Sequence, residues 1–137
     1  MKARLAILIL AASSYTAVGA SSELGLLTNY YHDCPASHGP QASYLRAVIT
    51  RALHGDEAAM CRVIMHEGVF STVDNEGYSE VPQALLRTLG DDRYSGFVTR
   101  QPRNVQELAL ALYPEQIRSF EQRFAKTAKL YHDRFSR

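Results

Sequence analysis

The densest group of side chains that could react or bind a metal ion lies between residues 32 and 38. His32, Asp33, Cys34 and His38 fall in this short segment, and imidazole, thiolate and carboxylate groups are the ligands that zinc takes in proteins. Their spacing would allow them to converge in a loop, although no second cluster elsewhere in the sequence completes such a site. The interpretation we favour is a polar loop held in place through Cys34, with no bound metal.

A second acidic segment, Asp74–Gly77 with Glu80 nearby, is similar to the start of a calcium-binding loop. An EF-hand needs glycine at the sixth position and glutamate at the twelfth, where this chain has Ser79 and Leu85. Asp and Asn also begin turns, and acidic side chains are favoured near a helix N-terminus. We therefore expect a turn followed by a helix here, and we predict no cofactor for the chain.

Cys34 and Cys61 are the only two cysteines. An even pair in an exported protein usually forms a disulfide, and closing a loop of this length would stabilise the fold by roughly 3–4 kcal/mol. The alternative is a nucleophilic thiol, but the sequence places no obvious set of a base and an orienting group around either cysteine, and a free thiol in an exported protein would be oxidised. We predict a Cys34–Cys61 disulfide and no catalytic residue.

The first twenty residues have the pattern of a secretory signal peptide. Two basic residues, Lys2 and Arg4, precede the apolar run 5–12, and small residues end the segment at Val18-Gly19-Ala20. The apolar run is too short to cross about 30 Å of hydrocarbon as a helix. The sequence therefore predicts cleavage after residue 20 and export to the periplasm or the cell exterior, with no membrane insertion afterwards.

Residues 21–137 have the length of a single domain. Removal of the signal peptide takes away two basic residues and no acid, which leaves a nearly neutral chain. A neutral balance is untypical of proteins that bind nucleic acid. We expect neither nucleic acid nor a membrane surface as a partner.

The apolar residues recur with a helical period almost throughout. This predicts an all-α fold, a compact bundle of five to six antiparallel helices arranged as helical hairpins. The helices of the bundle are expected at 41–54, 57–66, 79–89, 92–99, 104–112 and 115–135, with a short helix before them at 22–31. The core is expected to contain Ile49, Leu53, Val63, Leu85, Phe120 and Phe124.

Two of the predicted joints between helices have similar sequences. Gly55-Asp56 and Gly90-Asp91 each follow an Arg-x-Leu and lie about 35 residues apart. The spacing resembles that of tetratricopeptide and HEAT hairpins, but only over about a dozen residues, and the longer consensus of those families is absent. Glycine followed by an acid also suits the end of one helix and the start of the next in unrelated hairpins.

The longest polar connection, residues 67–78, is the predicted recognition segment. Loops on a rigid scaffold are common binding sites, and this one carries apolar side chains among polar ones. The alternative is that its apolar residues fold back as a lid on the core. The candidate binding residues are Phe70, Val73, Asp74, Glu76 and Tyr78.

Taken together, these features favour an exported, non-catalytic protein that binds another protein as an adaptor, inhibitor or immunity-type partner. This interpretation rests largely on elimination, because the sequence lacks the usual catalytic motifs. The alternative is a small exported enzyme or metal-binding protein that uses His32, Asp33 and His38, or the loop from Asp74 to Glu80.

Overall fold

The computed structural model describes residue 19 and residues 22–31, 39–71, 77–111, 118–119 and 121–136. This part of the chain is all-α and contains no strand. A helix at 22–30 is followed by α2 (Ala42–Leu53), α3 (Glu57–Ile64), a short 3-10 turn η2 (Gly68–Phe70), α4 (Gly77–Leu89), α5 (Asp91–Arg100), α6 (Arg103–Ala109) and α8 (Ala125–Phe135). The predicted fold class is confirmed in this respect.

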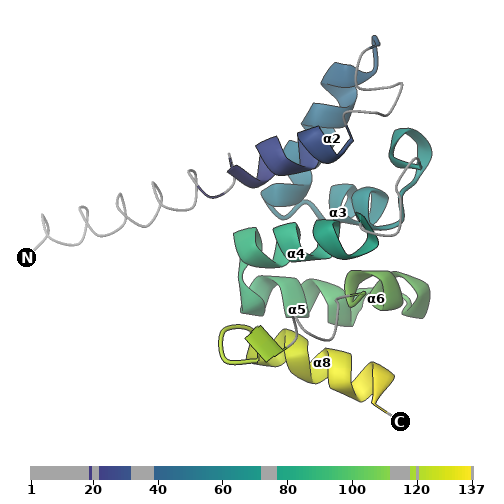
Figure 1. Cartoon of the computed structure of the whole chain (residues 1–137). Coiled ribbons are helices and arrows are strands. Elements are labelled where there is room, and N and C mark those ends of the chain that lie inside the picture. The colour runs from purple at the N-terminus through teal and green to yellow at the C-terminus, as the bar shows by residue number, and fades with distance from the viewer. Residues whose placement is uncertain are drawn as a thin grey trace, which may run out of the picture.

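The helices stack in chain order, from α2 at one end to α8 at the other (Figure 1). α2 packs against α3, α4 packs against both, α5 packs against α4, and α8 packs against α5. α6 contacts α3, α4 and α5. Because α4 packs against α2, α3, α5 and α6, it lies at the centre of the described packing.

The core is continuous from the helix at 22–30 to the start of α8. Central α4 contributes Val81, Leu85 and Leu86, none of which has any exposed surface. Five predicted core residues are confirmed as buried, and the sixth, Phe120, lies outside the described residues. The five confirmed residues are Ile49, Leu53, Val63, Leu85 and Phe124.

The prediction of one continuous helix over 115–135 is wrong. Residues 121–123 form a turn, Phe124 has non-helical backbone angles (φ −131°, ψ 54°), and α8 begins at Ala125. The carboxylate of Asp91 accepts hydrogen bonds from the backbone N–H groups of Lys126 and Thr127. These are N–H groups that a continuing helix would have bonded internally, so the contact with α5 marks a new helix start.

The other helix bounds agree with the predicted ones to within three residues. The largest consequence is at α4, which begins at Gly77 and therefore includes Tyr78, a residue predicted to lie in the connection. Apart from Gly19, the predicted signal peptide lies outside the described residues, and its cleavage stays a prediction. Within the described ranges, no helix has the length and apolar character needed to span a bilayer.

Candidate functional site

The joint between α2 and α3 is built from a glycine and a capping aspartate. Gly55 has φ +89°, a left-handed conformation that suits glycine. Asp56 accepts a 3.0 Å hydrogen bond from the N–H of Ala59 and pairs with Arg51 at 2.5 Å. The Ala59 hydrogen bond, followed by that of Arg51, lowers the pKa of Asp56. The joint is thus held by a charged carboxylate.

Helix α5 approaches this joint through Arg93. The guanidinium donates a 3.1 Å hydrogen bond to the carbonyl of His54, at the C-terminal end of α2, where a positive charge is favoured. A Cβ at Gly55 would lie 2.4 Å from Arg93 Nη2. Glycine at this position is therefore needed both for the backbone turn and for the close approach of the arginine.

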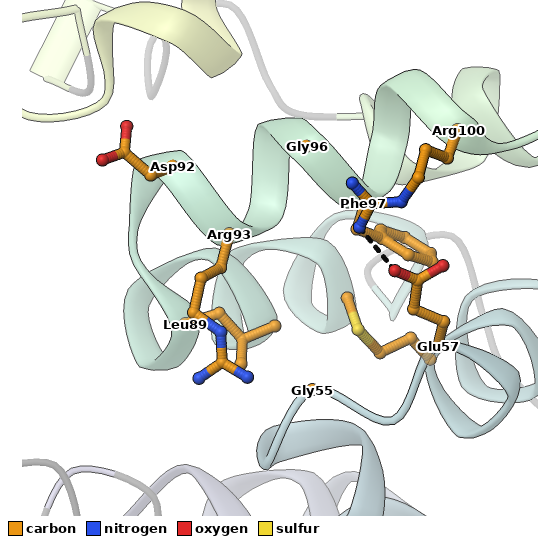
Figure 2. A pocket seen from close by; sticks show the side chains of 9 residues that line it. Gly55, Glu57, Leu89, Asp92, Arg93, Gly96, Phe97 and Arg100 are labelled. Atoms are coloured by element: carbon orange, nitrogen blue, oxygen red, sulfur yellow. Dashed lines mark hydrogen bonds and ion pairs between the residues drawn. The ribbon is translucent and has the colours of Figure 1, made fainter.

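A cleft of about 320 Å³ lies between this joint and α5. We call it the α5 cleft (Figure 2). Its apolar side chains are Met60, Leu89 and Phe97, all of which are buried members of the core. Its charged lining residues are Glu57, Asp92, Arg93 and Arg100. The cleft thus combines apolar side chains fixed by the core with charged groups.

One side of the α5 cleft is a chain of polar contacts. Arg100 pairs with Glu57 at 2.5 Å, and the second oxygen of Glu57 accepts a 3.3 Å hydrogen bond from the Gln101 amide. The side-chain oxygen Oε1 of Gln101 accepts a 3.2 Å hydrogen bond from Cys61 Sγ. Burial, followed by the charges of Glu57 and Glu67, raises the pKa of the half-buried Cys61 thiol. Because Arg100 and Glu57 form an ion pair, neither of these two charges is left without a partner.

The remaining two charges of the α5 cleft differ in their partners. Asp92 points away from the other lining side chains in Figure 2 and pairs with Lys126 of α8 at 2.6 Å. Within the described residues, Arg93 forms no ion pair and donates to a neutral carbonyl. Among the described residues, the α5 cleft therefore has one positive charge without an ion-pair partner, and such a charge can bind an anionic group.

A second cleft, of about 400 Å³, lies between the helix at 22–30 and α4. Its arginine, Arg87, makes a bidentate ion pair with Glu23, with distances of 2.8 and 3.0 Å. Glu80 also lines this cleft. The charged residues that line this cleft therefore have a net negative charge, and Arg87 is already paired with Glu23. This cleft is the weaker candidate for binding a ligand through its charge.

The predicted recognition segment is divided between the core and the surface. Phe70 is 1% exposed, and its ring packs 5.2 Å from that of Tyr31, which is the arrangement expected of a lid. Tyr78 is 39% exposed, with its ring 4.5 Å from that of His66. The other three candidates, Val73, Asp74 and Glu76, lie outside the described residues. The structure therefore does not present Phe70 and Tyr78 together on one surface.

The alternative metal ligands His32, Asp33 and His38 also lie outside the described residues, as does Cys34. The Cys34–Cys61 disulfide stays a prediction for that reason. Within the described ranges, no three His, Cys, Asp or Glu side chains are close enough together to hold a metal ion.

Sequence reasoning identified the Gly55-Asp56 joint but did not select Arg93 or Arg100. Their seven-residue spacing, with Gly96 between them, places them on one face of α5, and this was the available signal. No family model matches the chain, and neither a curated protein nor a solved structure is significantly similar to it. Function is therefore inferred from the chain's own residues.

Proposed function

We propose that the protein is an exported, non-catalytic binding protein and that the α5 cleft is its binding site for a protein partner. The observation that carries this proposal is the uncompensated guanidinium of Arg93 beside the apolar side chains of Met60, Leu89 and Phe97. An arginine next to buried apolar groups is typical of residues that contribute most to protein–protein binding.

The rigidity of the α5 cleft supports this role. Leu89 and Phe97 are on α4 and α5, Met60 is on α3, and all three are packed into the shared core. A site built on helices loses little conformational entropy when it binds. The same scaffold holds Arg93 through the His54 carbonyl, so the charge is positioned before a ligand arrives.

The proposed compartment rests on the sequence of residues 1–20, which has the basic, apolar and small-residue parts of a signal peptide. A cysteine pair is also common in exported domains. The proposed partner is therefore a protein of the periplasm or the cell exterior.

The proposal is tested by cross-linking the exported protein in its native cells and identifying the captured proteins by quantitative mass spectrometry. Arg93→Gln removes the charge of the α5 cleft. Arg103→Gln is the matched control, because Arg103 is exposed and pairs only with Glu107 on its own helix among the described residues. We expect a partner that is lost with Arg93→Gln and retained with Arg103→Gln. A set of captured proteins that does not respond to Arg93→Gln would overturn the assignment.

A further inference from the structure

We infer that the α5 cleft recognises a peptide segment of its partner in which an acidic side chain is next to an apolar one. This inference rests on the proposed function and names the chemistry of the ligand. The acidic group would pair with Arg93, and the neighbouring side chain would lie against Leu89, which is 9% exposed and has the most accessible surface of the three apolar lining residues.

The charges that line the α5 cleft favour a ligand with a single negative charge. Arg100 is paired with Glu57, and Asp92 is paired with Lys126. Of the four charged side chains that line the cleft, Arg93 is then the one without an ion-pair partner among the described residues. A phosphate would bring up to two negative charges close to Glu57 and would have to compete for Arg100. A carboxylate matches the charge that is available.

The geometry of Arg93 also suits a carboxylate. A guanidinium has five N–H donors in a planar fork that can bind both oxygens of a carboxylate. The His54 carbonyl takes one bond, from Nη2. The other donors are available to a ligand without loss of this contact, which would keep the arginine oriented during binding.

Gly96 lies at the edge of the α5 cleft and leaves room for the Arg100 side chain. It lies on α5 between Arg93 and Arg100 (Figure 2), and a Cβ there would lie 3.3 Å from Arg100 Nη1. The absence of a side chain lets the guanidinium of Arg100 lie close to the surface of α5, so a larger side chain at this position would displace Arg100 from the edge of the cleft. The cleft volume of about 320 Å³ is at the small end of the range for ligand sites, which suits one or two side chains.

The probes are the peptides acetyl-Ala-Asp-Leu-Ala-amide and acetyl-Ala-Asn-Leu-Ala-amide, together with inorganic phosphate. Each is titrated into the ¹⁵N-labelled mature protein, and amide chemical shifts are followed. We expect the aspartate peptide to shift the amides of 54–57 and 93–100. The asparagine peptide should bind at least about fivefold more weakly, because it lacks the charged hydrogen bond.

Variants of the protein test whether Arg93 is responsible for the preference for the aspartate peptide. Arg93→Gln should remove the preference for aspartate, whereas Arg103→Gln should leave it intact. Gly96→Leu, which displaces the Arg100 side chain at the edge of the cleft, should weaken both peptides. Equal affinity for the two peptides, no shift with either, or tighter binding of phosphate would overturn the inference.

The inference and the proposed function fail in different ways. If capture of a partner depends on Arg93 but the aspartate peptide has no advantage, the acidic-ligand inference is wrong and the binding role of the cleft stands. If capture does not depend on Arg93, the proposed function itself is wrong.

Discussion

The two glycine–aspartate joints have similar sequences but hold different parts of the molecule together. Both glycines have left-handed backbones, with φ of +89° at Gly55 and +78° at Gly90. Asp56 caps its own helix, α3, through Ala59. Asp91 is instead the first residue of α5, and its carboxylate accepts three 2.8 Å hydrogen bonds from the first turn of α8.

The difference shows that a short motif specifies a turn without specifying what the turn contacts. At the second joint the carboxylate is used to dock α8, whose packing against α5 covers that side of the stack (Figure 1). At the first joint the carboxylate is used locally, and the neighbouring space between Gly55 and α5 stays open as the α5 cleft. One joint is therefore structural, and we propose that the other supports binding.

Leu85→Ala should have the largest effect, because it disrupts the helix on which both joints depend. Leu85 has no exposed surface and lies on central α4. Its truncation should lower the free energy of unfolding by about 2–5 kcal/mol, measured by urea denaturation. Leu85→Met keeps most of the volume and should cost less than about 1.5 kcal/mol. Equal stability of the alanine variant and the wild type would show that the described packing is wrong.

Asp91→Ala should separate the two joints. Loss of three hydrogen bonds to a charged group should cost about 1.5–3 kcal/mol, and hydrogen exchange should speed up selectively in α8. Asp56→Ala should cost about 0.5–2 kcal/mol, with the loss confined to the start of α3. Faster exchange of α8 in both variants would show that the two joints are not independent.

The two glycines sharpen the comparison further. Gly55→Ala and Gly90→Ala should each cost at least about 1–2 kcal/mol, because both impose a positive φ on alanine, and the backbone of Gly90 (φ +78°, ψ 168°) lies in a region that only glycine adopts readily. A Cβ at Gly90 meets no atom within 4 Å, whereas one at Gly55 displaces Arg93. Both variants should therefore melt at lower temperatures than the wild type, and only Gly55→Ala should weaken partner binding. Loss of binding with Gly90→Ala alone would contradict this assignment.

Replacement of His66, which follows the end of α3, should have the smallest effect on stability at neutral pH. His66 follows α3 with φ +52° and is buried, and within the described residues its Nδ1 has no hydrogen-bond partner. Burial lowers the pKa of His66 to about 4, against an ordinary value near 6.5. The unfolded chain therefore binds the proton first, and this residue should make stability fall as the pH decreases from about 6.5 to 4.

His66→Asn tests this dependence, because asparagine tolerates the left-handed backbone and does not titrate. The variant should lose less stability than the wild type between pH 7 and pH 4, as followed by the melting temperature. An identical pH profile for the two proteins would show that folding does not lower the pKa of His66.

The helices and most of the core could be predicted from the sequence, because they follow from local periodicity. Ile49, Leu53 and Leu85 lie on regular apolar stripes, and glycine marks two of the turns. The break before Ala125 could not be predicted, since it depends on Asp91, which is more than thirty residues away in the chain. Arg93 was overlooked for the same reason: its importance comes from a contact with the end of α2.

The most direct test of the binding site is hydrogen exchange of the mature protein with and without its captured partner. We expect the partner to cover the first joint and to leave α8, which is docked at the second joint, uncovered. We predict that partner binding slows exchange at residues 54–60 and 91–100, around the α5 cleft, and leaves α8 unchanged. Protection of α8 or of the helix at 22–30, with no change at 54–60 and 91–100, would contradict the assignment of the α5 cleft as the site.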